Sequence, residues 1–290
     1  MANELRSGTE GAQMQFAEWL DNKIGREVRP QNVHRPHLAY HGRENSDVFQ
    51  WTINADPGVG VGVNAATDQT NATASGFTPT AVTASAGTIG QMTTVLDELN
   101  AVSVVDAFAN FGAVLVRSIL EKYETDFCAL ADDSFSNSTS TSGIDLTGDT
   151  FFAAHAALLA RDVFGMEVSV LDPVQSTDLQ RDVQSSTAAM YGNDSVDING
   201  IAAASLAGYQ FTYLGIPVYQ TSLQGTANSG ADNVGSIYIS GEALGLYEIW
   251  GPRTEMQRDA SMMGTEIVAS ARYGVVEIRD SFGQAIVTDA

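Results

Sequence analysis

The sequence has 290 residues, 44% of them hydrophobic, and a formal net charge of −21 at pH 7. A chain of this length can bury a sizeable core, as one large domain or as two lobes. The acidity argues against binding to the phosphate backbone of a nucleic acid as the main function, because lysine and arginine drive that binding. The one cysteine, Cys128, excludes a disulfide framework and a multi-cysteine metal site.

The first 45 residues are polar, and their pattern predicts one short amphipathic helix around residues 14–24. Pro30 and Pro36 then predict an extended arm, because proline disfavours helix at and before its own position. The segment has no apolar stretch of signal-peptide length, and no run of 18 apolar residues predicts a membrane span. We therefore expect synthesis in a cytoplasm and no membrane partner.

Residues 46–90 are strand-like at both ends, which read DVFQWTIN (47–54) and TAVTASAGTI (80–89). The stretch between these ends is polar and rich in glycine, so it cannot build a core of its own. This pattern predicts a long two-stranded excursion whose tip lacks buried contacts within its own subunit.

Apolar residues at steps of three and four predict a long helix over residues 102–130, a rod of about 43 Å. These residues are Val104, Phe108, Phe111, Leu115, Ile119, Tyr123, Phe127 and Leu130.

The middle of the chain predicts a helix, a strand and a second helix. Asp149 or Thr150 can cap the first helix, which we expect to run through Phe164. MEVSVL (166–171) follows as a strand, and Asp172–Pro173 supplies an N-cap and a first-turn proline for the next helix.

The last third of the chain predicts mostly strands. GYQFTYLGIPVYQTS and GSIYIS are strand-like, and TEMQRDA and TEIVASARYGVVEI alternate well enough to form a hairpin through residues 261–264. The whole pattern predicts an α+β fold in two lobes.

No stretch of the sequence carries a convincing catalytic, phosphate-binding or metal-binding motif. PGVGVGVN (57–64) resembles a phosphate loop, but Val63 occupies the third glycine position and no strand–turn–helix context surrounds it. His34, His37 and His41 could in principle gather a metal, but Pro36 lies between the first two and no acidic residue has helical spacing to them, so we expect solvated arm histidines. His155 and Cys128 are expected to pack in the core. We therefore predict no catalytic residue, no metal site and no cofactor, and a protein that is not an enzyme.

The order of segments resembles the major capsid proteins of tailed bacteriophages, the Hong Kong ninety-seven fold family. TPTAVTASAGTIGQMTTVLDELN is similar to the strand that returns from that family's extended loop, and VVDAFANFGAVLVRSILEKYETDFCALA to its spine helix. MEVSVLDPVQSTDLQRDV and LGIPVYQTS resemble its axial domain, and GSIYISGEALGLYEIWGP with the residues to 280 its closing sheet. The resemblance implies five regions: an N-terminal arm (1–45), an extended loop (46–90), a peripheral domain with the spine helix (91–131), an axial domain (132–235) and a peripheral closing sheet (236–290).

The closing sheet holds a concentration of arginines that needs a physical reason. In the family this sheet and the extended loop lie at contacts between subunits, and arginine suits such contacts because its planar fork pairs with carboxylates. Mixed charges argue against a nucleic-acid patch, and the alternative is a solvated face whose ion pairs contribute about 0–1 kcal/mol each. The candidate contact residues are Arg253, Glu255, Arg258, Asp259, Arg272, Glu277 and Arg279.

The resemblance implies a subunit that assembles into hexamers and pentamers of an icosahedral shell around double-stranded DNA, without sequence-specific DNA binding. It also implies a portal protein, a separate scaffolding protein and an optional decoration protein as partners, and a virion location after synthesis in the bacterial host's cytoplasm. The acidity fits a wall that confines DNA without gripping it, and it fits a saline habitat equally well. The alternatives are an encapsulin-type nanocompartment that encloses protein cargo, and a secreted carbohydrate-binding or hydrolytic protein, which the lack of a signal peptide disfavours.

Overall fold

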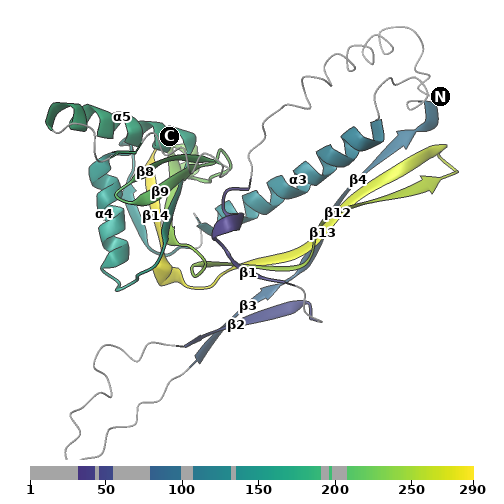
Figure 1. Cartoon of the computed structure of the whole chain (residues 1–290), viewed down its shortest axis with the longest axis horizontal. Coiled ribbons are helices and arrows are strands. Elements are labelled where there is room, and N and C mark those ends of the chain that lie inside the picture. Colours follow the sequence, from purple (N-terminus) through teal and green to yellow (C-terminus); the bar gives the residue numbers. More distant parts are fainter. Residues whose placement is uncertain are drawn as a thin grey trace, which may run out of the picture.

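The computed structural model describes residues 32–42, 46–54, 79–98, 107–131, 135–190, 196–197 and 208–290. They form the expected α+β fold, which consists of a four-stranded sheet, an eight-stranded sheet and a separate two-stranded hairpin (Figure 1). No helix in the described part of the chain is both long and apolar enough to cross a membrane.

The helices are α3 (Ala107–Ala129), α4 (Gly148–Leu159) and α5 (Pro173–Met190), with short 3-10 turns η1 (Arg35–His37), η3 (Asn228–Gly230) and η4 (Asp280–Phe282). The strands are β1 (Ala39–His41), β2 (Val48–Asn54), β3 (Pro79–Ser85), β4 (Gly87–Leu96), β5 (Ser138–Thr141), β6 (Glu167–Leu171), β7 (Val196–Asp197), β8 (Tyr209–Tyr213), β9 (Ile216–Gln220), β10 (Thr226–Ala227), β11 (Asp232–Ile239), β12 (Leu244–Asp259), β13 (Gly264–Glu277) and β14 (Gly283–Asp289).

The four-stranded sheet has the order β1-β12-β13-β4, and α3 runs along one of its faces (Figure 1). Strands β12 and β13 form the expected hairpin, with Asp259 paired to Gly264 across the turn. The predicted long helix is confirmed from Ala107 onward, and residues 102–106 lie outside the described part. Its periodic side chains, such as Ile119 and Phe127, are buried against the sheet because they recur on one face of the helix.

The eight-stranded sheet follows the order β5-β14-β11-β6-β9-β8-β7, and β10 pairs with β11. Helices α4 and α5 contribute Phe151 and Leu179 to one buried cluster on this sheet. The predicted strand at residues 166–171 and the helix after it are confirmed as β6 and α5. Asp172 caps α5, because its carboxylate accepts a hydrogen bond of 2.8 Å from the backbone N–H of Val174.

Two local expectations were wrong. Helix α4 begins two or three residues early, because Thr147 rather than Asp149 or Thr150 accepts the capping hydrogen bond, and it ends at Leu159 instead of Phe164. The arm histidines are not solvated: His34 and His37 are buried, because η1 lays them against the core. Burial lowers the pKa of His37 to about 4, so its imidazole is neutral at physiological pH.

Strand pairing also differs from the expected region boundaries. The division at residue 236 cuts through β11, which lies wholly in the eight-stranded sheet, and β14 belongs to that sheet too. Similarly, β4 starts at Gly87, inside the expected extended loop, but pairs with β13 along its whole length. The reason is that the chain crosses between the sheets three times, and pairing between distant strands is not visible in sequence order.

The two-stranded excursion is confirmed at its base, where β2 and β3 pair antiparallel from Val48 with Ser85 to Asn54 with Pro79. Strand β3 continues into β4 with only Ala86 between them, so one long strand joins the excursion to the four-stranded sheet (Figure 1). The tip of the excursion, residues 55–78, and the helix expected around residues 14–24 lie outside the described residues.

Candidate subunit-contact surface

The four-stranded sheet has one covered face and one open face. Along β13, odd-numbered residues from Ile267 to Tyr273 are buried beneath α3, while the even-numbered residues between them point to the other face. Arg253 and Glu255 on β12 pair directly with Ser270 and Val268, so these two charges lie on the open face.

Trp250 gathers two of the candidate arginines on that open face. The guanidinium of Arg253 lies 4.8 Å from the Trp250 ring centre and that of Arg272 lies 5.6 Å from it. Arg253 also lies 3.2 Å from Glu255. Cation–π contact and the ion pair therefore hold both guanidinium groups in place.

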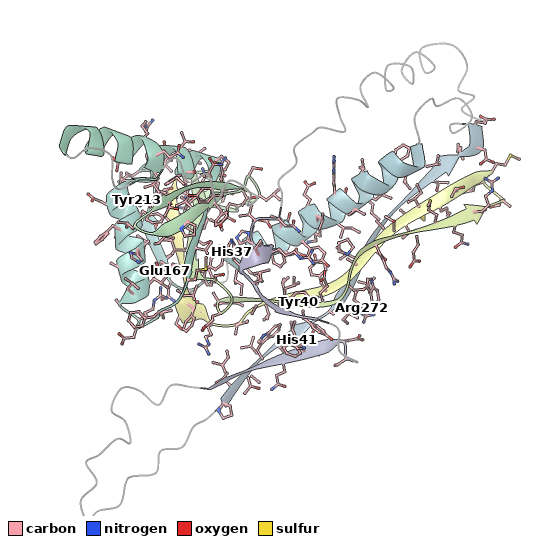
Figure 2. All side chains as sticks on the ribbon, viewed as in Figure 1. His37, Tyr40, His41, Glu167, Tyr213 and Arg272 are labelled. Carbon is pink, nitrogen blue, oxygen red and sulfur yellow. The ribbon has the colours of Figure 1, made fainter. Side chains whose placement is uncertain are left out.

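Arg272 connects the sheet to the base of the excursion. One of its guanidinium nitrogens lies 2.7 Å from the Asp47 carboxylate, which directly precedes β2. Figure 2 shows Arg272 close to the place where the β2–β3 hairpin meets the four-stranded sheet, with His41 near the same junction. This pair therefore helps to set the direction in which the excursion leaves the body.

Aromatic packing at the same junction was not anticipated from the sequence. The His41 ring stacks on Phe49 at 3.6 Å between ring centres, and Phe49 packs edge-on against Trp51 at 4.5 Å. Tyr247 donates a hydrogen bond of 2.5 Å to the Ser46 carbonyl oxygen. The only sequence signal for this cluster was the alternation of aromatic residues in DVFQWTIN.

Arg258 and Asp259 lie at the tip of the β12–β13 hairpin. Arg258 donates to both oxygens of Asp97, and the second contact measures 2.7 Å. This forked hydrogen bonding lowers the pKa of Asp97 and joins the end of β4 to the end of β12. Asp259 instead accepts bonds from the backbone N–H and hydroxyl of Ser261, so it shapes the turn.

Glu277 and Arg279 lie elsewhere: Glu277 is the last residue of β13, and Arg279 lies on the link that leads to the eight-stranded sheet. Burial, followed by the charge of Asp280 and a hydrogen bond with it, raises the pKa of Glu277 to about 7. Arg279 lies 3.2 Å from Glu242 and stacks over Phe282 at 4.7 Å. These two residues therefore lie at the connection between the sheets, which we call the hinge for its position alone, rather than on the open face.

The seven candidate residues thus fall into three places: the open face, the hairpin tip and the hinge. Every candidate arginine has a carboxylate partner within the chain, and three of those partners, Asp47, Asp97 and Glu242, were missed by sequence reasoning. Arg258 and Asp97 are 161 positions apart, so no local pattern could have paired them. Among the described residues, one group of potential metal ligands gathers away from this surface, next to η1.

Comparison with known proteins gives matches in structure alone. No protein-family model matches the sequence, and no curated protein matches it either. A capsid structure of the cyanophage P-SCSP1u matches with a TM-score of 0.68 at 12% identity, covering 90% of this chain and 89% of that one. A structure of Mycobacterium phage Che8 matches with a TM-score of 0.67 at 15% identity, covering 90% and 92%.

A third match is the holo-SrpI encapsulin complex from Synechococcus elongatus PCC 7942. Its TM-score is 0.65 at 11% identity, with 91% of this chain and 89% of that chain covered. Each of the three matches covers about nine tenths of both chains, so none is confined to one lobe. The chain therefore has the α+β fold shared by these phage capsid and encapsulin subunits.

Proposed function

We propose that this chain is a major capsid protein of the Hong Kong ninety-seven fold family of tailed bacteriophages. It assembles into hexamers and pentamers of an icosahedral shell around viral double-stranded DNA, and its role is structural rather than enzymatic. The observation that carries the proposal is the match to a phage capsid subunit over 90% of this chain and 89% of that one.

The exposed edges of the four-stranded sheet support an assembling subunit. In the described part of the chain, β1 covers only residues Gly245–Tyr247 of the outer edge of β12, and β4 ends the sheet on the other side. Unpaired strand edges and an open sheet face are surfaces that a neighbouring copy can cover. The charged residues of the open face and hairpin tip then act as contact residues that also oppose unspecific strand pairing.

The remaining partners follow from the same family. We propose a portal protein at one vertex, a separate scaffolding protein during assembly and, optionally, a decoration protein on the finished shell. DNA is enclosed without sequence-specific contacts, which agrees with a net charge of −21. The subunit is made in the cytoplasm of the bacterial host and ends in the virion.

An encapsulin-type nanocompartment is the second candidate, and the match to the SrpI encapsulin complex supports it. Electron microscopy of the purified full-length protein tests both proposals. Closed shells of uniform diameter support a shell subunit, and a protein that stays monomeric at every concentration and ionic strength contradicts it. Nuclease-protected DNA in shells isolated from infected host cells favours the capsid, whereas a co-purifying enzyme inside the shells favours the nanocompartment.

A further inference from the structure

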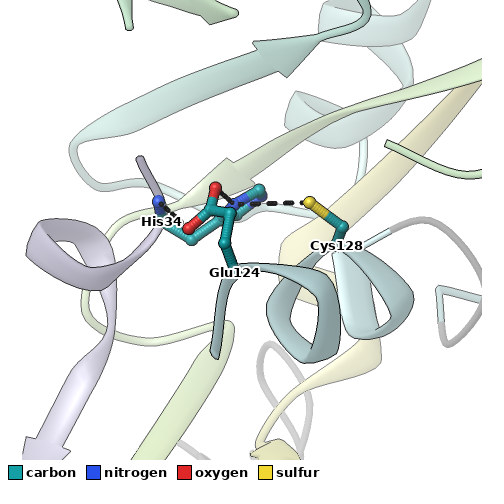
Figure 3. Close-up of side chains that lie close together, drawn as sticks. All are labelled: His34, Glu124 and Cys128. Atoms are coloured by element: carbon teal, nitrogen blue, oxygen red, sulfur yellow. Dashed lines mark hydrogen bonds and ion pairs between the residues drawn. The ribbon is translucent and has the colours of Figure 1, made fainter. Parts of the chain in front are cut away.

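Three potential metal ligands meet where the N-terminal segment crosses α3. Figure 3 shows the imidazole of His34 beside the carboxylate of Glu124 and the thiol of Cys128. The ligand atoms of the three side chains lie within 4.8 Å of one another. His34 directly precedes η1. Glu124 and Cys128 lie one helical turn apart on α3, so their side chains are on the same face of the helix.

The group is shut off from solvent. His34 and Glu124 are 0% exposed and Cys128 is 1% exposed. His34 Nδ1 lies 2.7 Å from a Glu124 oxygen and 4.0 Å from the Cys128 sulfur. One imidazole nitrogen therefore faces both a carboxylate and a thiol, which is more than a single N–H can satisfy with good geometry.

The buried carboxylate of Glu124 needs a positive charge, since an uncompensated buried anion is strongly destabilising. Arg35, which directly follows His34 in the sequence, is already bound to both oxygens of Glu248 at 3.0 and 3.1 Å. The Nε2 atom of His34 is also buried without a hydrogen-bond partner in the described part of the chain. A buried polar atom without a partner is destabilising.

We propose that His34, Glu124 and Cys128 bind a zinc ion. A zinc ion with one thiolate, one carboxylate and one neutral imidazole has no net charge, which suits a site without solvent. Imidazole nitrogen, thiolate sulfur and carboxylate oxygen are the ligand atoms by which proteins bind zinc. This proposal reverses the expectation from sequence that the chain holds no metal.

The geometry fits with a small adjustment. Bonds of about 2.1 Å to nitrogen and 2.3 Å to sulfur at the tetrahedral angle give a separation of about 3.6 Å, near the observed 4.0 Å. The Glu124 oxygen must move away from Nδ1 to make room for the ion, which a rotation of this long side chain provides. Tyr238 stacks on His34, and its hydroxyl is buried without a partner among the described residues, so a metal-bound water would satisfy it.

The site would join the N-terminal segment to the long helix, because one ligand precedes η1 and two belong to α3. It would be loaded during folding, since the closed structure leaves the three ligands buried. The proposal rests on these contacts alone and does not depend on shell assembly.

The first experiment measures zinc in the full-length protein purified from zinc-supplemented cells. Elemental analysis after dialysis should give about one ion per chain. Cys128→Ser and Glu124→Gln should each lower the zinc content at least tenfold, since even loss of a supporting residue costs about 10–100-fold in affinity. Two control variants keep all three ligands. Phe127→Leu loosens the packing of α3 next to Cys128. His155→Gln removes a histidine that pairs with Glu167 of the eight-stranded sheet.

The second experiment needs no variant, which matters because buried substitutions can prevent folding. Cobalt(II) replaces zinc, and a thiolate ligand gives an intense sulfur-to-cobalt charge-transfer absorption. Folded wild-type protein should show this absorption, and adding zinc should remove it. Folded wild-type protein with less than about one tenth of an ion per chain, or with cobalt bound but no such absorption, overturns the proposal. Equal zinc in Cys128→Ser and wild type overturns it as well.

Discussion

The two sheets differ in how much of their surface the chain itself buries. In the eight-stranded sheet, all eight residues of β11 are buried, since helices cover one side and the core beneath α3 covers the centre of the other. In the four-stranded sheet, β12 is buried over its first five residues and becomes exposed toward the hairpin tip. One strand therefore runs from an interior into a surface that its own subunit leaves open.

If the chain assembles into a shell as we propose, this contrast separates residues that stabilise the isolated subunit from residues that contact other copies. Both faces of the eight-stranded sheet are covered within the chain, so substitutions there should act on folding of the isolated subunit. In the outer half of the four-stranded sheet few side chains are buried within the chain, and its ion pairs join exposed side chains. Its substitutions should act mainly on contacts between copies.

The largest effect is expected in the core of the eight-stranded sheet. Phe151 is fully buried, so Phe151→Ala should lower the free energy of unfolding by about 3–5 kcal/mol. The neighbouring Phe152 is 57% exposed, and Phe152→Ala should change it by less than about 0.5 kcal/mol. Denaturant titration of both variants measures the difference, and equal losses would show that α4 does not present the face described.

A smaller effect is expected where the excursion meets the four-stranded sheet. A Cβ atom on Gly274 would lie 2.8 Å from the carbonyl carbon of Ser85, and this backbone cannot move aside as a side chain can. Gly274→Ala should therefore cost about 1–3 kcal/mol, as overpacking does. It should also displace the base of the excursion and so reduce the yield of closed shells.

Gly87 is the matched control, because a Cβ there would meet nothing within 4 Å. Gly87→Ala should leave both unfolding and shell yield close to those of the wild type. If Gly87→Ala and Gly274→Ala behave alike, close backbone approach at this junction is not what fixes the excursion.

The sequence predicted the elements whose signal is local. Helix α3, the β12–β13 hairpin and the cap of α5 could be read from periodicity and from single residues such as Asp172. It did not predict which distant strands pair: β11 was expected as a strand, but its pairing with β14 on one side and with β6 on the other is encoded by no alternation pattern.

The same reason explains the misjudged histidine. Prolines and polar neighbours made the segment around His34 look solvated, yet its partner Glu124 lies 90 positions away on the long helix. The candidate arginines were found because they cluster in sequence. Their partners were not found, since they lie on other strands.

The hinge between the sheets should respond to pH. The pKa of Glu277 is raised from an ordinary value of 4.5 to about 7, so the folded state binds the proton more tightly than the unfolded state. The resulting stabilisation is complete below about pH 4.5 and is lost as the pH rises through about 7.

Glu277→Gln tests this dependence because an amide resembles the protonated acid and does not titrate. The variant should match the wild type at pH 4.5 and exceed it in unfolding midpoint at pH 8. The difference should stay below about 1 kcal/mol, because the group is partly solvated and screened. A constant difference between the two proteins across this pH range would show that Glu277 does not titrate there.

The smallest effect on the subunit is expected at the hairpin tip, and here the two regions can be compared with matched chemistry. Arg258 pairs with Asp97 in the four-stranded sheet, and Arg181 pairs with Asp145 beside the eight-stranded sheet, both exposed. Lysine keeps the charge but loses the planar fork, so Arg258→Lys and Arg181→Lys should each change unfolding by about 0–1 kcal/mol.

Assembly should distinguish the two variants. If Arg258 also contacts a neighbouring copy, Arg258→Lys should raise the protein concentration needed for shell formation at least about threefold, equivalent to about 0.7 kcal/mol per subunit. Arg181→Lys should leave that concentration unchanged. Light scattering across a concentration series measures both, and equal behaviour would remove Arg258 from the contact surface while leaving its bond to Asp97 as a bond within the subunit.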